Sequence, residues 1–367
     1  MSAATTYLVT AGLMLGLILA PMAGPASATL NLFTAFQNAA LSIDGGTDPK
    51  GGTNANLQTD VPNGATVLAA FLYVSDVNGS NPTPTGSVTL AGNVLNLSTF
   101  TKLGPNESAA NHYRLNVTSI MKPIIEGTFG LQTHTYTESN FMDGAVLVVA
   151  YRTAATTGTA IILDGELAQA GDVTTLTFGS PYTSGAVIMS LASSFSFNGS
   201  GSGTNPTPVG QVTVVDVTTS SNATPRVLSQ CAGGNDDGDF IGANGQLITV
   251  GGVGDSTGNP HPQCTGGGGD DELYDLSQGN AVDSTPFLTA GDTSITFNTN
   301  NPSFDDNVFG LFFTSSIQVT EVDDQTIPTD DGPTDDGPPP TGVPYPATLL
   351  LLGAGLLGTA IAARKRS

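Results

Sequence analysis

Between residues 30 and 320 the chain alternates short apolar runs with turns rich in Gly, Asn, Pro and Asp. Within many runs apolar and polar residues alternate with a period of two, as at Val88 and Leu90 and again at Ile295 and Phe297. This period is typical of strands that bury one face, so we expect an all-β fold and no amphipathic helix of useful length. The expected strands span 67–74, 87–90, 113–117, 145–151, 160–163, 173–178, 186–197, 211–217, 293–297 and 308–319.

Two runs are apolar at nearly every position. They cover residues 145–150 and 309–313. A strand that is apolar on both faces has no side for solvent, and such runs are typical of central strands. We therefore expect both runs to be central strands of buried sheets.

The chain also contains an internal duplication. Four segments recur in the same order in both halves, and the first pair is followed in each half by the letters NPTP. The aligned segments are 67–80 with 187–200, 85–90 with 209–214, 127–133 with 291–297, and 141–150 with 304–313. The spacing predicts a tandem or duplicated antiparallel β-sandwich, jelly-roll-like, with units 29–165 and 166–322. The units are either two domains or two halves packed face to face.

The second unit is longer than the first by about 40 residues, mostly within 220–280. This insertion contains both cysteines, Cys231 and Cys264. Two cysteines in an exported chain are expected to pair, so we predict a disulfide that closes the insertion.

The first 28 residues have the order of a secretory signal peptide. An apolar stretch over residues 7–20 precedes Ala26-Ser27-Ala28, a small-x-small cleavage site. The sequence therefore predicts export and removal of residues 1–28.

The C-terminal segment 343–367 has three features in a fixed order: a Pro-x-Pro element, an apolar span over 347–363 of near-minimal length for a membrane helix, and a basic end. The residues outside the span are Val343, Pro344, Tyr345 and Pro346, then Arg364, Lys365 and Arg366. This order resembles the PEP-CTERM sorting signal of Gram-negative bacteria, with Tyr345 in place of the usual Glu. An ordinary single-span anchor is the alternative.

The resemblance implies a route and a location. Signal peptidase and an exosortase would process the chain during transient anchoring in the inner membrane, and the product would reach the cell surface or extracellular matrix. The exported region also resembles uncharacterised members of this group at residues 247–255, 270–276 and 291–309. An acidic Pro/Gly linker at 323–342, with TDDGP twice in tandem, would separate the globular region from the membrane.

The net charge of −22 at pH 7 argues against binding to nucleic acid, because phosphate would be repelled. Neutral polymers, cations and basic surfaces are compatible partners. We interpret the oxygen-bearing side chains in and beside the insertion as a solvated acidic loop, with a calcium site as the alternative, because hard cations need such clustered oxygens. These candidates are Asn235, Asp237, Asp239, Asp270, Asp271 and Glu272.

Catalytic motifs are weak. The string GDSTG at 254–258 matches a nucleophile elbow around Ser256, but the prolines that follow forbid the required helix, so we interpret it as a turn. We therefore expect a non-enzymatic protein without an obligatory cofactor. Its expected role is structural or adhesive, associated with exopolysaccharide, biofilm or neighbouring surface proteins. A polysaccharide- or calcium-binding module is the alternative, and a secreted hydrolase the third.

Overall fold

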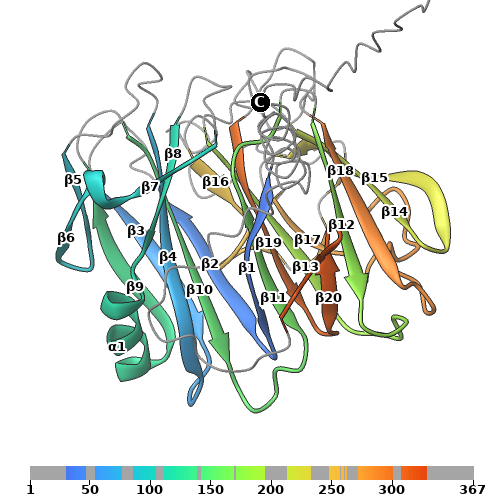
Figure 1. Cartoon of the computed structure of the whole chain (residues 1–367), viewed down its shortest axis with the longest axis horizontal. Coiled ribbons are helices and arrows are strands. Elements are labelled where there is room, and N and C mark those ends of the chain that lie inside the picture. The colour runs from blue at the N-terminus through green and yellow to red at the C-terminus, as the bar shows by residue number, and fades with distance from the viewer. Residues whose placement is uncertain are drawn as a thin grey trace, which may run out of the picture.

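The computed structural model describes residues 30–46, 54–76, 86–104, 111–138, 142–168, 171–194, 213–232, 248–256, 258–259, 261–262, 272–300 and 307–328. Strands dominate these residues, and every strand pairing among them is antiparallel (Figure 1). The all-β prediction is confirmed.

The first two sheets are formed by the N-terminal half of the chain. Inner sheet 1 has the order β2-β10-β4-β8-β7, and outer sheet 1 has the order β3-β9-β5-β6. Their strands are β2 (Ala40–Gly46), β3 (Asn54–Val61), β4 (Thr66–Asp76), β5 (Ser87–Leu90), β6 (Asn93–Asn96), β7 (Thr101–Leu103), β8 (Asn111–Asn116), β9 (Gly130–Thr137) and β10 (Met142–Arg152).

The other two sheets hold the C-terminal half and the first strand. Inner sheet 2 has the order β1-β11-β19-β13-β16, with β17 also on β13, and outer sheet 2 has the order β15-β14-β18-β12-β20-β21. Their strands are β1 (Asn31–Gln37), β11 (Thr159–Asp164), β12 (Asp172–Phe178), β13 (Val187–Ser194), β14 (Thr213–Thr219), β15 (Asn222–Ala232), β16 (Ile248–Val250), β17 (Leu273–Asp275), β18 (Ser294–Asn300), β19 (Asn307–Ser315), β20 (Val319–Val322) and β21 (Gln325–Thr326). Strands β1 and β11 both fall within the predicted first unit, 29–165, and they pair with each other beside β19 in inner sheet 2.

Three apolar clusters lie between the four sheets. Leu72 and Leu147 pack in the cluster shared with outer sheet 1, whereas their neighbours Phe71 and Val148 pack in a cluster shared with inner sheet 2. On β19, Phe312 faces inner sheet 1 and Phe313 faces outer sheet 2. Because successive side chains of a strand point to opposite faces, β4, β10 and β19 are buried on both sides. The prediction of central strands at 145–150 and 309–313 is confirmed.

The same pairing scheme occurs in both halves. Strands β2, β3, β4, β5, β9 and β10 pair with one another as β11, β12, β13, β14, β18 and β19 do. The register agrees with the sequence alignment, which matches Phe71 to Leu191 and Val148 to Leu311. Phe71 pairs with Val148 on β4 and β10, and Leu191 pairs with Leu311 on β13 and β19.

The outer sheets agree in the same way. Leu90 pairs with Tyr136, and Val214, which is aligned with Leu90, pairs with Asn300, which corresponds to Tyr136 when the alignment of 127–133 with 291–297 is continued by three residues. The internal similarity in the sequence therefore coincides with strand register in two separate pairs of sheets.

The expectation that no useful amphipathic helix exists was wrong. Helix α1 (Thr118–Thr128) follows β8 and buries Met121 and Ile125 in the cluster of outer sheet 1. Asn116 Oδ1 accepts a hydrogen bond from Thr118 N at 3.0 Å and satisfies one N–H of the first turn. Pro123 within the helix obscured its apolar stripe in the sequence.

Two predicted boundaries were also wrong. The run 308–319 is not one strand: β19 ends at Ser315, and the chain turns before β20 in another sheet. Ser315 Oγ accepts a hydrogen bond from Ile317 N at 3.2 Å in this turn. The first residues of the predicted linker instead form the β20–β21 hairpin, because Asp323 and Asp324 adopt positive φ and Ile327 is buried.

Candidate functional site

A buried ion pair joins the two inner sheets. Arg114 Nη1, on β8, donates to Asp164 Oδ2, at the end of β11, and Tyr73 OH donates to the same oxygen at 2.8 Å. The guanidinium carbon lies 3.2 Å from the ring centroid of Phe33 on β1. Burial raises the pKa of Asp164, while Arg114 and Tyr73 oppose that rise by stabilising the carboxylate.

A second polar cluster lies between the same sheets. His112 Nε2 is 2.8 Å from Ser194 Oγ, and His112 Nδ1 is 3.6 Å from Glu166 Oε1. The imidazole stacks on Phe309 with ring centroids 4.8 Å apart. The three polar residues come from β8, from the segment after β11 and from the end of β13.

The hydroxyl, imidazole and carboxylate stand in the order found in hydrolase triads. However, Ser194 is 0% exposed and His112 is 1% exposed, so in this conformation a substrate cannot touch the hydroxyl. The hydrogen bond between His112 and Ser194 instead pairs two buried polar groups where β8 packs against inner sheet 2, whereas the 3.6 Å between His112 Nδ1 and Glu166 Oε1 is too long for a hydrogen bond. The members of the cluster are far apart in the sequence and form no motif, so sequence reasoning missed it.

A third buried carboxylate lies on β2. Asp44 is 6% exposed, and its Oδ2 accepts a hydrogen bond from Gln58 N on β3. Burial raises the pKa of Asp44 to about 7, and the negative charge of Asp255 adds to the rise. Val253 N donates to Ile43 O at 2.8 Å, which holds the segment containing Asp255 against β2.

The Gly-rich part of the segment 247–255 is needed for this close approach. A Cβ added at Gly252 would lie 2.0 Å from Ile43 O, and one at Gly251 would lie 2.6 Å from the backbone of Glu272. Gly251 and Gly252 of this motif therefore have a packing role, because only glycine lets the backbones approach.

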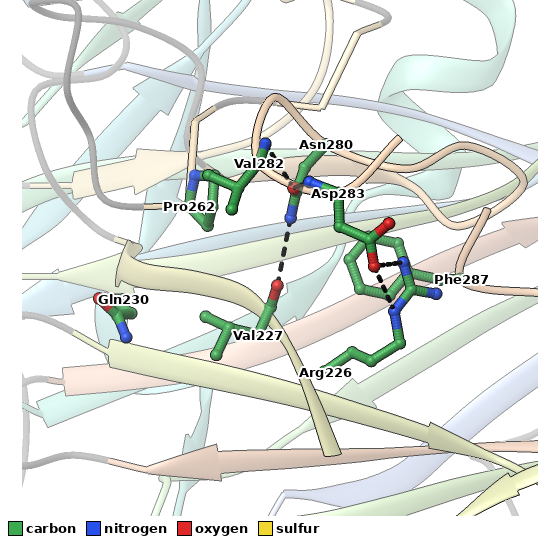
Figure 2. Close-up of a pocket in the computed structure, with 8 residues that line it drawn as sticks. All are labelled: Arg226, Val227, Gln230, Pro262, Asn280, Val282, Asp283 and Phe287. Atoms are coloured by element: carbon green, nitrogen blue, oxygen red, sulfur yellow. Dashed lines mark hydrogen bonds and ion pairs between the residues drawn. The ribbon is translucent and has the colours of Figure 1, made fainter. Parts of the chain in front are cut away.

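An open pocket lies at the far edge of outer sheet 2, next to β15 (Figure 2). Its volume is about 260 Å³. Val282 is 65% exposed and Val227 is 36% exposed, and Figure 2 shows them on facing walls. The pocket is lined by Arg226, Val227, Gln230, Pro262, Asn280, Val282, Asp283 and Phe287.

Arg226 fixes one wall of this pocket. Its Nε and Nη2 both donate to Asp283 Oδ2, at 3.1 and 2.7 Å. Its remaining bonds go to Thr285 O at 2.6 Å and Pro286 O at 2.7 Å, and the guanidinium lies 4.4 Å from the ring centroid of Phe287. The positive charge of Arg226 is thus compensated. These bonds hold the segment between β17 and β18 (residues 276–293, here the pocket loop) against β15.

Asp292 anchors the other end of the same loop. Its Oδ2 accepts from Thr289 N at 2.7 Å, and its Oδ1 accepts from Ser221 N at 3.0 Å, beside β15. Although burial acts to raise it, these hydrogen bonds bring the pKa of Asp292 down to about 2. Both ends of the pocket loop are therefore tied to the sheet.

Of the six calcium candidates the structure describes only Glu272. Glu272 is 0% exposed beside β17, so the solvated-loop interpretation was wrong for this residue. Within the described ranges no group of three or more His, Cys, Asp or Glu side chains is placed to hold a metal ion. The candidates Asn235, Asp237, Asp239, Asp270 and Asp271 lie outside the described residues.

The structure describes only some of the remaining predicted residues. Cys231 belongs to β15, whereas Cys264 lies outside the described residues, so the disulfide stays a prediction. Ser256 Oγ accepts from Gly258 N at 3.2 Å in a turn, as expected. Of the helices in the described residues, none is long and apolar enough to cross a membrane. The signal peptide and Val343, Pro344, Tyr345, Pro346, Arg364, Lys365 and Arg366 also lie outside them.

The chain was compared with known proteins at three levels. No profile of a known protein family matches it, and neither a curated protein nor a solved structure matches it significantly.

Proposed function

We propose that this chain is an exported cell-surface or matrix protein with a structural or adhesive role associated with exopolysaccharide. In this proposal signal peptidase removes residues 1–28, and an exosortase processes the segment 343–367. The globular region acts as a rigid, non-enzymatic block held away from the membrane by the acidic linker.

The observation that carries the proposal is the stacking of the two inner sheets. Strands β4, β10 and β19 are buried on both faces, and Phe71, Val148 and Phe312 form a continuous apolar layer between the sheets. The ion pair of Arg114 and Asp164 crosses the same interface. These contacts favour one block over two hinged domains, because a large apolar interface opposes relative motion.

The repeated pairing scheme supports the duplicated β-sandwich. Each half contributes one outer and one inner sheet with a shared apolar cluster, as face-to-face sheet packing requires. We interpret the structure as two sandwiches of common origin, fused through their inner sheets.

The export route and the role are tested separately. Mass spectrometry of the protein from its native host should give a product that begins near residue 29 and ends near residue 346. An intact C-terminus at Ser367 would contradict exosortase processing. A deletion strain should lose aggregation, adhesion or matrix retention, and unchanged behaviour in all three would overturn the structural role.

The pocket favours a second candidate, a polysaccharide-binding module. Apolar walls beside amide and charged groups are the usual composition of a small-molecule site, and the pocket is open to solvent. Calorimetry with polysaccharide from the native host tests this function.

A further inference from the structure

A row of outward-facing side chains on outer sheet 2 leads across the sheet to the pocket. Register places Val173, Asn298, Asp216 and Val227 opposite one another on β12, β18, β14 and β15. Directly opposed side chains of antiparallel strands share a face, and the intervening residues Val215 and Phe297 are buried in the core. This row therefore faces outward and ends at Val227, which also lines the pocket.

A second outward row lies beside the first. Thr175, Thr296 and Thr218 are opposite one another on β12, β18 and β14, and the hydroxyls of Thr175 and Thr296 are 3.0 Å apart. Val173 is 62% exposed in the first row. With strands about 4.8 Å apart, the first row spans roughly 14 Å before it reaches the pocket.

The chemistry of this surface is nearly neutral. Asp216 is the one charged side chain in the two rows, and Arg226 in the pocket is already compensated by Asp283. The surface thus presents methyl groups of Val and Thr together with hydroxyl and amide groups. Sugar rings present the same combination, with C–H faces and hydroxyl edges, whereas a polyanion would be repelled by the net charge of −22.

We propose that the pocket and the two rows form a single binding track for a neutral polysaccharide chain. The inference rests on the proposed surface role and names the substrate class. Arg226 and Asp292 hold the pocket loop in place before binding, so little conformational entropy is lost on association. Phe287 in the pocket lining is only 3% exposed, so the accessible apolar contacts come from aliphatic side chains; each sugar therefore contributes little and affinity requires a long chain.

Affinity electrophoresis of the purified exported protein tests the track. The probes are dextran, hydroxyethylcellulose and galactomannan as neutral polymers, alginate as the polyanion, and glucose as the monomer. We expect at least one neutral polymer to retard the protein, while alginate and glucose do not. Failure of all three neutral polymers, or equal retardation by alginate, would overturn the proposal.

Two variants locate the site. Val282→Asp, at the pocket, should weaken binding at least tenfold, and the neutral Val282→Ser should weaken it less. The control is Val94→Asp on β6, because Val94 is 72% exposed on the opposite outer sheet. Circular dichroism checks that all variants fold. Equal binding by Val282→Asp and Val94→Asp would show that the track is not the site.

The outcome is separable from that of the proposed function. If the track fails but the deletion strain loses adhesion, the surface role stands without this inference. If the protein binds neutral polymer through Val282 but the deletion strain behaves normally, the track stands and the structural role fails.

Discussion

Asp44 should make this protein less stable as the pH rises from 4 to 8. The folded state holds the pKa of Asp44 near 7 because the carboxyl is buried, whereas the unfolded chain has the ordinary value of 3.8. A raised pKa means that the folded state favours the protonated form. The stabilisation is complete below the unfolded pKa and is lost as the pH passes through 7.

The size of the effect follows from the shift. Each pKa unit corresponds to about 1.36 kcal/mol, so a shift of roughly three units gives about 4 kcal/mol between pH 4 and pH 8. Asp44→Asn removes the titration and keeps an acceptor oxygen for Gln58 N, which bonds to Asp44 Oδ2. Relative to the native protein, the variant should therefore gain stability by up to about 4 kcal/mol as the pH rises from 4 to 8.

Urea unfolding across this pH range measures the effect. Tyrosine fluorescence or far-UV circular dichroism serves as the signal, because the chain has no Trp. Asp60→Asn is the matched control, since Asp60 is an exposed carboxylate on neighbouring β3 and surface substitutions change stability by about 0.5 kcal/mol or less. If Asp44→Asn kept the native dependence on pH, the assignment of a buried, protonated Asp44 would be refuted.

Three further substitutions test the packing. Arg114→Met leaves Asp164 buried without its cation and should cost about 3–5 kcal/mol at pH 7 in urea unfolding, with a smaller loss when combined with Asp164→Asn; an unchanged midpoint would contradict the role of the ion pair. Gly252→Ala forces a Cβ against a β2 carbonyl and should cost about 1–3 kcal/mol, whereas Gly127→Ala, in helix α1 with open space around it, should raise Tm slightly. Asp292→Asn weakens hydrogen bonds to backbone N–H groups and should cost about 1–3 kcal/mol at pH 7. The pKa of Asp292 is depressed to about 2, so its contribution to stability is present above pH 4 and is lost as the pH falls toward 2. The stability difference between Asp292→Asn and the native protein should therefore vanish in acid. A difference that persisted at pH 2 would contradict the anchoring role of Asp292.

The strand predictions rested on the local alternation of apolar and polar residues. Each of the ten expected ranges overlaps a strand of the structure, and 308–319 overlaps two, because a period of two and flanking turn residues specify a half-buried strand without knowledge of its partner. Helix α1 was missed because it is short and contains Pro123. The expected list omitted strands β1, β2, β3, β6, β7, β9, β15, β16, β17 and β21. Of these, β6, β7, β16, β17 and β21 have only two to four residues, and so short a segment carries little periodic signal.

The candidate sites depended on residues that only the fold brings together. His112 and Ser194 are 82 residues apart, and Arg226 and Asp283 are 57 residues apart, so no motif joins them. The pocket needed both β15 and the loop that Arg226 holds against it. Neither contact follows from spacing, because loop closure over such lengths is compatible with many partners.

The sequence by itself determined the antiparallel strands, the central position of the two apolar runs and the similarity of segments in the two halves. These properties follow from side-chain periodicity and from similarity between aligned segments. The tertiary structure decided that the inner sheets stack, with Phe71 and Phe312 in one layer and Arg114 paired across it with Asp164. An apolar run indicates that a strand is buried on both faces. Which segments bury it is decided by packing between parts of the chain that are distant in sequence.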